Sequence, residues 1–146
     1  MIIRKGKEKD INNNLLKLYI EGFRYHYNGR PDIFTNKTDE ELKQDLINDI
    51  NNTNFLVLED DIIVGYITYK INNKHAKVLW TDQLVVDEGY RKKGYGKQLF
   101  NKVKEIAKEE NCKRIELSCW SFNQNALDMY EHIGFKNQKE VLEMEL

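Results

Sequence analysis

The chain has 146 residues, of which 40% are hydrophobic and 32% charged, and its 23 basic and 24 acidic side chains give a net charge of −1. This size and balance are typical of one globular domain, so we expect residues 1–146 to form a single domain. A near-neutral charge argues against a protein that coats nucleic acid, and no apolar run reaches the roughly 18 residues of a membrane span. The charged N-terminus lacks the apolar stretch of a signal peptide, so we expect a cytoplasmic protein with neither nucleic acid nor membrane as its partner.

The first half of the chain predicts one strand and two helices. Residues 2–5 are a short strand candidate, and an apolar stripe at helical spacing predicts a helix over residues 10–27. Thr38 and Glu41 have the spacing of a capping box, which predicts the start of a second helix. The segment between the two helices, residues 29–37, has the composition of a loop.

The second half predicts a mixed sheet. Strands joined by short turns form antiparallel pairs, whereas the strand–helix–strand crossover between residues 76 and 119 predicts one parallel pair. Helices then cover the faces of an α/β sheet. The expected elements are strands at 55–58, 62–71 and 76–86, a helix from about 94–96, a strand at 114–119, a helix at 123–132 and a strand at 141–146.

Cysteine and histidine give no sign of a disulfide or a metal site. Cys112 and Cys119 are seven residues apart on one expected strand, so their side chains point to opposite faces. The histidines at positions 26, 75 and 132 are scattered and do not have the spacing of metal ligands. We therefore expect no metal.

Residues 91–96 read Arg-Lys-Lys-Gly-Tyr-Gly and lie between an apolar strand and an amphipathic helix. The first turn of a helix has N–H groups without partners and a partial positive charge, and glycines allow a phosphate to approach that backbone. Arg91, Lys92, Lys93 and Lys97 add positive charge at the same place. The pattern predicts a pyrophosphate site, although a tight turn with solvated lysines fits the hexapeptide alone equally well.

Together with its surroundings, this loop resembles that of the GCN5-related N-acetyltransferase (GNAT) family, whose pyrophosphate loop has the form Arg/Gln-x-x-Gly-x-Gly/Ala. Residues 82–87 resemble the family's fourth strand, and residues 123–130 followed by Gly134-Phe135 resemble its other signature. The resemblance implies a GNAT-like fold, with a mostly antiparallel central sheet, one splayed parallel strand pair and helices on both faces. It also implies acetyl-CoA as co-substrate and direct transfer of the acetyl group to an amine.

The resemblance assigns roles to individual residues. In the family the pantetheine arm enters between the splayed strands, so the N–H of Leu84 would face the acetyl oxygen and Val86 would bind the pantetheine amides. Tyr130 matches the tyrosine that protonates the sulfur. Asn123 would bind the pantetheine arm, cap its helix, or do both. The expected cofactor-binding residues are Leu84, Val85, Val86, Arg91, Lys92, Lys93, Gly94, Tyr95, Gly96, Lys97, Asn123 and Tyr130.

Asp82 is the candidate general base. In strand alternation it shares a face with Trp80, Leu84 and Val86, which predicts apolar neighbours. Burial would raise the pKa of this carboxyl group and favour a role as base through a water molecule. A β-bulge in the strand would break this argument, and a position at a strand end in water remains open. Family members usually have the longer glutamate here.

The acceptor site is expected at the first two helices, the loop between them and the end of the chain. Aromatic rings with an acid suit a cationic amine, although ordinary core packing explains the same residues equally well. Asp82-Gln83 resembles the strand end of polyamine-acetylating relatives but lacks their second acid. A polyamine-like molecule is the leading candidate, and peptide amino groups and aminoglycosides stay open. A non-catalytic coenzyme A-binding regulatory module is the alternative to an enzyme, and a homodimer is left open. The expected lining residues are Tyr25, His26, Tyr27, Asp32, Phe34 and Asp82.

Overall fold

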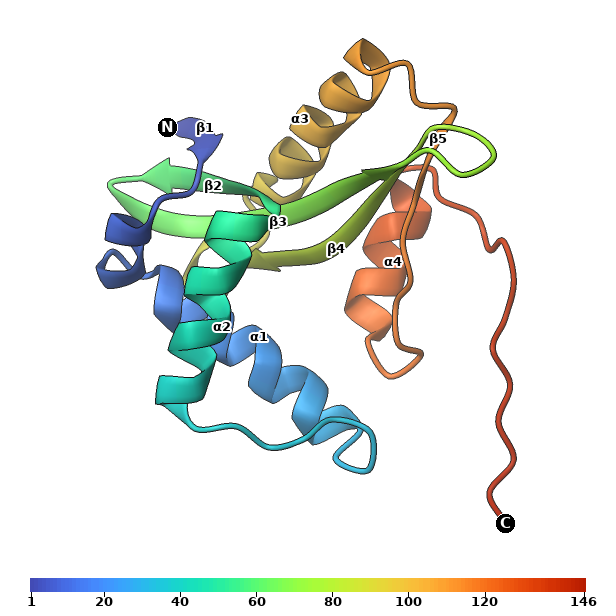
Figure 1. The fold of residues 1–146 in the computed structure, drawn as a ribbon, viewed down its shortest axis with the longest axis horizontal. Coiled ribbons are helices and arrows are strands. Elements are labelled where there is room, and N and C mark those ends of the chain that lie inside the picture. Colours follow the sequence, from blue (N-terminus) through green and yellow to red (C-terminus); the bar gives the residue numbers. More distant parts are fainter.

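The computed structural model describes residues 1–146 as one five-stranded sheet with four α-helices and two short 3₁₀ helices (Figure 1). None of the helices combines the length and apolar character needed to cross a bilayer. In chain order, the elements are β1 (Ile2–Lys5), η1 (Glu8–Asn12), α1 (Leu15–Gly29), α2 (Asp39–Asn52), β2 (Asn54–Asp60), β3 (Ile62–Asn72), β4 (Val78–Val86), η2 (Glu88–Tyr90), α3 (Tyr95–Glu109), β5 (Arg114–Glu116) and α4 (Gln124–His132).

The strands lie in the order β1-β2-β3-β4-β5. The first three pairs are antiparallel and the last pair, β4 with β5, is parallel. This arrangement confirms the predicted mixed α/β sheet. The crossover from β4 through α3 to β5 is long enough for a parallel pair, whereas short turns join β2 to β3 and β3 to β4.

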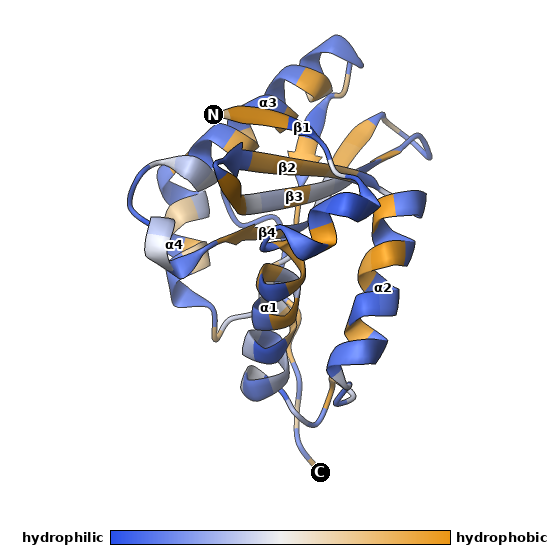
Figure 2. Ribbon diagram, turned by 90° about the vertical axis from the view of Figure 1, so that its left-hand side faces the viewer, coloured by the Kyte–Doolittle hydropathy of each residue, from blue (hydrophilic) through white to orange (hydrophobic).

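Each face of the sheet carries its own apolar core. Alternate residues of a strand point to opposite faces, so Val57 packs in the core under α1 and α2, while Leu58 packs in the core under α3. The α3 helix contributes Leu99 and Val103, which are fully buried. Figure 2 shows these helices with hydrophobic and hydrophilic stripes, as expected for helices that cover a sheet.

The second helix begins as its sequence predicts. The N–H of Glu41 donates to Thr38 Oγ1 at 3.2 Å, and the N–H of Thr38 donates to Glu41 Oε1 at 3.1 Å. This capping box satisfies two backbone donors that the helix itself leaves without partners. Leu42, Leu46 and Ile50 then form the buried stripe of α2.

The first helix differs from the prediction of one helix over residues 10–27. The chain forms the 3₁₀ helix η1, and α1 starts only after Asn14, which has a left-handed conformation with φ of 73°. Asparagine tolerates this conformation better than most residues. Its side-chain amide donates to Ile63 O at 2.9 Å and to Asp87 Oδ2 at 2.8 Å, which fixes α1 against β3 and the end of β4.

The predicted final strand does not form. Residues 141–146 are exposed and have no strand partner, and Figure 1 shows the C-terminal segment running away from the sheet. β5 likewise ends at Glu116 rather than at residue 119. The alternating apolar residues of the last segment favour a strand, but a strand also needs a neighbour. The segment is instead held through Glu143, whose carboxylate pairs with Arg30 at 2.8 Å.

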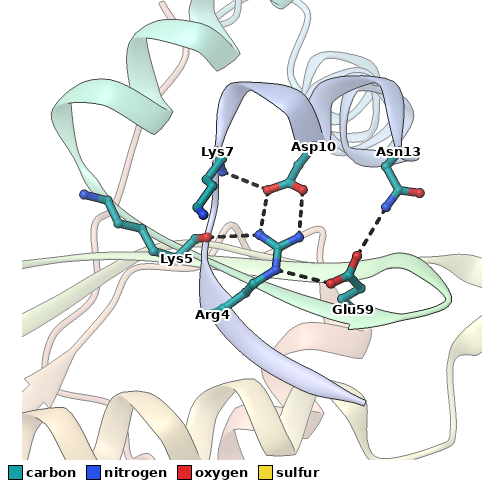
Figure 3. A network of polar contacts seen from close by, with 6 residues as sticks. All are labelled: Arg4, Lys5, Lys7, Asp10, Asn13 and Glu59. Atoms are coloured by element: carbon teal, nitrogen blue, oxygen red, sulfur yellow. Dashed lines mark hydrogen bonds and ion pairs between the residues drawn. The ribbon is translucent and has the colours of Figure 1, made fainter.

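A paired cluster of charges joins the 3₁₀ helix η1 to strands β1 and β2 (Figure 3). The Arg4 guanidinium donates to both carboxylate oxygens of Asp10, at 2.8 and 2.9 Å, and to Glu59 Oε1 at 3.2 Å. The N–H of Lys7 also donates to Asp10, at 2.8 Å. The arginine lowers the pKa of the Asp10 carboxyl group below its usual value, since its hydrogen bonds favour the charged form.

Candidate active site

One edge of β4 is free beyond its first three residues. β5 pairs only with residues 78–80, so β4 has no strand partner on that side for residues 81–86. The N–H of Asp87 donates to Val64 of β3 at 2.8 Å. Because successive residues of a strand direct their backbone groups to alternate sides, those of Leu84 and Val86 point away from β3, to the free edge. The backbone groups of Leu84 and Val86 therefore face an edge of β4 that has no strand partner.

The loop before α3 presents consecutive N–H groups without partners. Gly94 has φ of 79° and immediately precedes the helix, and the first helical hydrogen bond joins Gln98 N to Gly94 O at 3.0 Å. No backbone N–H of residues 92–97 donates a hydrogen bond within the protein. Nothing lies within 4 Å of where a side chain at Gly94 would begin. This geometry fits an anion such as a diphosphate, because several amides and the positive end of α3 face the same space.

The basic side chains of the loop are not neutralised by acids. Arg91, Lys92, Lys93 and Lys97 form no ion pair. Arg91 Nε lies 3.4 Å from Val86 O, and so connects the loop to the free edge of β4. The positive charges are available to an anionic ligand.

Tyr95 supports the loop through its side chain. Its hydroxyl donates to Oδ2 of Asp60, the last residue of β2, at 2.8 Å, and its ring stacks on Tyr90. The nearby carboxylate raises the pKa of Tyr95. The phenol thus points to the sheet, which leaves only the backbone N–H of this residue for a ligand.

Tyr130 lies on α4 with its ring packed edge-on against Phe135, at a centroid distance of 5.6 Å. Its hydroxyl makes no hydrogen bond, and since the structure has no buried side-chain polar atom without a partner, this hydroxyl must be accessible to solvent. Burial of the ring, with a smaller contribution from Cys119, raises the pKa of Tyr130 to about 12. The phenol therefore keeps its proton at neutral pH, as a proton donor requires.

Asn123 caps α4, which confirms one of the two roles expected from the sequence. Its Oδ1 accepts from the N–H of Ala126 at 3.4 Å and from the Tyr25 hydroxyl at 3.4 Å. The second contact joins α4 to α1.

Cys119 and Cys112 are both free and half-buried, and no group of three or more His, Cys, Asp or Glu side chains is placed to hold a metal ion.

The expected burial of Asp82 is wrong. Thr68 of β3 pairs with Gln83, and Tyr69 pairs with Thr81, so Asp82 is the extra residue of a β-bulge. The bulge breaks the alternation on which the expectation rested. The Asp82 side chain is exposed and has no hydrogen bond or ion pair. The desolvation that would make it a base is therefore missing.

Gln83, its neighbour, lies in a polar network under the sheet that the sequence did not reveal. Its amide accepts from the Tyr66 hydroxyl at 2.9 Å and donates to Asp49 at 3.2 Å. Asp49 also accepts from the Tyr19 hydroxyl at 2.6 Å. These contacts hold the bulged part of β4 against α1 and α2.

Three of the expected acceptor residues meet in one aromatic cluster, formed by Tyr25, His26, Phe34, Trp120 and Phe122. Neighbouring rings have centroids 5.7 to 6.2 Å apart. The two rings that sequence reasoning missed come from the segment after β5, directly before Asn123. The sequence signal that could have identified these rings is a pair of aromatic residues immediately before Asn123, the residue predicted to cap the helix.

Asp32 and Tyr27 do not join this cluster as free lining residues. The Asp32 carboxylate accepts two hydrogen bonds from Arg30, at 2.9 and 3.0 Å, and this arginine lowers the pKa of Asp32. Arg30 also lies over the Trp120 ring, 5.5 Å from its centroid. Tyr27 stacks instead on Phe23, on another side of α1. The charge of Asp32 is thus already compensated.

Comparison with known proteins identifies the family. The sequence profile described as "Acetyltransferase (GNAT) family" matches residues 13–135. This chain belongs to the GNAT acetyltransferase family. Among GNAT relatives, the spermine/spermidine N(1)-acetyltransferase of Bacillus subtilis (strain 168) is 34% identical over 88 residues, which cover 56% of this chain and 57% of that protein. The chain spans about half the length of the curated relatives that it matches.

Solved structures show the same GNAT fold. A tetramutant of a Bacillus halodurans protein superposes with a TM-score of 0.84 at 24% identity, over the full length of both chains. The PaiA N-acetyltransferase of Thermoplasma acidophilum, solved in complex with coenzyme A, superposes with a TM-score of 0.73 at 24% identity, covering 92% of this chain and 89% of that one. At this identity the likeness establishes the fold alone.

Proposed function

We propose that this chain is an acetyl-CoA-dependent N-acetyltransferase that moves the acetyl group directly to a primary amine of a small cationic molecule, such as a polyamine, or of a peptide. The observation that carries the proposal is the free edge of β4 beside the unpartnered amides of residues 92–97. Only residues 87–91 separate the two features along the chain. An elongated ligand with a diphosphate at one end and amides along its arm would match both.

The residues present fit coenzyme A. The amides of residues 92–97 and the positive charges around them would hold the diphosphate. The outward backbone groups of Leu84 and Val86 would bind the amides of the pantetheine arm as a neighbouring strand does. Acetyl-CoA, when bound, supplies a thioester carbonyl that an amine can attack.

Two groups of the chain would then promote the transfer. The N–H of Leu84 points to the free edge of β4, where it can donate to the carbonyl oxygen as negative charge develops there. The acceptor's ammonium first releases one proton to solvent, which leaves a neutral amine that can attack. As the C–N bond forms and the C–S bond breaks, the Tyr130 hydroxyl, protonated at neutral pH because its pKa is about 12, can give its proton to the departing sulfur. The proton that the new amide nitrogen loses can return to the phenolate through solvent. The chain needs no covalent intermediate of its own.

The acceptor side favours a cation. The aromatic cluster supplies ring faces and edges, and Tyr25 is 46% exposed within it. We assign Asp82 to attracting the ammonium group, since its carboxylate is exposed and unpaired on the bulge next to Gln83. The name of the Bacillus subtilis relative, a spermine/spermidine acetyltransferase, supports the polyamine class.

The test is a thiol-release assay with acetyl-CoA and a panel of polyamines, lysine analogues and peptides with free amino groups. We expect turnover on at least one cationic amine and much less on neutral amines of similar size. Calorimetry with coenzyme A accompanies the assay. If coenzyme A binds and no acceptor in the panel is acetylated, the chain is a coenzyme A-binding module and the enzymatic proposal fails.

A further inference from the structure

A cavity of about 190 Å³ lies between α3 and α4. It is separate from the free edge of β4 and from the aromatic cluster. The lining residues are Lys97, Phe100, Asn101, Lys104, His132 and Ile133.

The cavity is basic and contains no acid. Lys97 and Lys104 are seven residues apart, about two helical turns, so they lie on the same face of α3. Neither lysine is in an ion pair, and His132 makes no hydrogen bond. Lys102 of the same helix, in contrast, lies 3.3 Å from Glu105. The lysines at the cavity are therefore the ones that the helix leaves without a counter-charge.

The end of α4 does not cancel this positive charge. The carbonyl groups of Met129, Tyr130 and Glu131 accept hydrogen bonds from the three amides of residues 133–135. These bonds satisfy three of the last four carbonyl groups of α4, and so reduce the negative charge that its end presents. The charged or titratable side chains that line the cavity are two lysines and a histidine.

The cavity adjoins the phosphate-binding loop. Met129 Sδ lies 3.6 Å from the position where a Cβ at Gly96 would be, so α4 packs against the first turn of α3. One turn further along, Phe100 of α3 and His132 of α4 line the cavity. Lys97 follows Gly96 directly and belongs to both places. Lys104 lies about 10 Å along the axis from Lys97, the scale of one nucleoside between two phosphate groups.

We propose that this cavity binds the 3′-phosphate of coenzyme A through Lys104 and His132, and so makes the chain selective for coenzyme A over its 3′-dephospho form. The proposal rests on the proposed function, because it requires a diphosphate on residues 92–97, next to the cavity that Lys97 also lines. The chemistry recognised is a phosphate monoester next to a diphosphate. The pair of lysines on one helix face supplies the charge, and the cavity supplies the room.

Calorimetry with coenzyme A, 3′-dephospho-coenzyme A and adenosine 3′,5′-bisphosphate tests this assignment. We expect the unmodified chain to bind coenzyme A about tenfold more tightly than the dephospho form, because a charge-assisted contact is lost in the latter. Lys104→Met should reduce this ratio to near one by weakening coenzyme A alone. His132→Gln should reduce it in part. Both side chains are exposed, so the fold should tolerate the changes.

Lys108→Met is the matched control, since it removes the same charge from the same helix outside the cavity. It should leave the tenfold ratio unchanged. Equal affinity for the two coenzyme forms in the unmodified chain would overturn the 3′-phosphate site while leaving the proposed function standing. If neither form binds, the proposed function falls, and this assignment falls with it. If Lys104→Met does not weaken the binding of adenosine 3′,5′-bisphosphate, that result also contradicts the assignment of the 3′-phosphate site.

Discussion

Two polar regions of this molecule contrast in how they use their hydrogen bonds. In the cluster around Arg4 and Asp10, both carboxylate oxygens and the guanidinium are paired within the protein. In the loop of residues 92–97, six consecutive backbone amides have no partner in the protein, and the lysines around them have no acid. The first arrangement fixes the conformation of the chain, whereas in the second the unpaired N–H groups and ammonium groups remain free to bind a ligand. Polar groups that are fully paired contribute to stability, and a preorganised set that is left free indicates a site.

The strongest test of this comparison places a bulky side chain in the loop of residues 92–97. Gly96→Trp adds an indole at a position whose Cβ would lie 3.6 Å from both Met129 Sδ and Val86 Cγ2, beside the free amides of the loop. We expect the affinity for coenzyme A to fall by about a thousandfold, since close approach to the amides is lost. Calorimetry measures the affinity, and circular dichroism checks the fold.

Gly96→Ala is the control for that change. A methyl group meets its neighbours at 3.6 Å, an ordinary contact, and alanine suits the helix better than glycine. It should fold at least as well and bind coenzyme A within a few fold of the original. Undiminished affinity in Gly96→Trp would show that the amides of this loop do not hold the ligand.

Removing the proton donor should affect chemistry and spare binding. Tyr130→Phe is expected to lower kcat about a hundredfold, while coenzyme A affinity changes little. The pKa of Tyr130 is about 12, so deprotonation of this phenol should cause no loss of kcat between pH 7 and 10. Rates measured across this range test both statements. A decline in kcat that is present in the original chain and absent in Tyr130→Phe would contradict the raised pKa.

The paired cluster should respond in stability and not in binding. Asp10→Asn is expected to lower the free energy of unfolding by about 2 kcal/mol near neutral pH, because Arg4 loses a charged partner at a largely buried position. The folded pKa of Asp10 lies below its ordinary 3.8, so its contribution is complete above that pH and is lost as the pH falls through the folded value. Urea unfolding should give a constant difference from pH 7 to 5 and a shrinking one below 3.8.

Glu8→Gln provides the comparison for Asp10→Asn. Glu8 lies on the same 3₁₀ helix, is exposed and has no ion pair, so its effect should stay within about 0.5 kcal/mol. Both variants should bind coenzyme A as the original does. A large loss of affinity in Asp10→Asn would mean that the two polar regions are not independent.

The sequence allowed the parts of the fold that depend on local patterns to be predicted. The capping box at Thr38, the glycine loop and the crossover helix all follow from spacing within about ten residues. The bulge at Asp82 depends on which residues of β3 lie opposite, and alternation along one strand does not contain that information. The break at Asn14 was similarly hidden, because a helical stripe continues across it.

The residues proposed to bind the acceptor were harder to predict than those proposed to bind the cofactor, because they also depend on contacts between distant parts of the chain. The direction of backbone groups follows from the strand pairing, so the loop and the strand before it were enough to predict roles for the main chains of Leu84 and Val86, which stay predictions. The aromatic cluster instead brings the end of α1 together with Trp120 and Phe122, about ninety residues later in the chain. The terminal segment was predicted as a strand from its alternating residues, although nothing in those residues specifies which edge it would join.

Asn14 has a consequence beyond its role at the start of α1. Both protons of its side-chain amide are committed, one to the main chain of β3 and one to Asp87, whose own carboxylate also receives the N–H of Gly89 in the turn toward the glycine loop. The first helix is therefore tied to the corner where the cofactor is expected by the Asn14 amide together with Lys17, whose ammonium lies 3.7 Å from Asp87 Oδ2. An aspartate at position 14 would set its carboxylate against two acceptors and would leave Lys17 as the remaining polar contact to Asp87 from this helix.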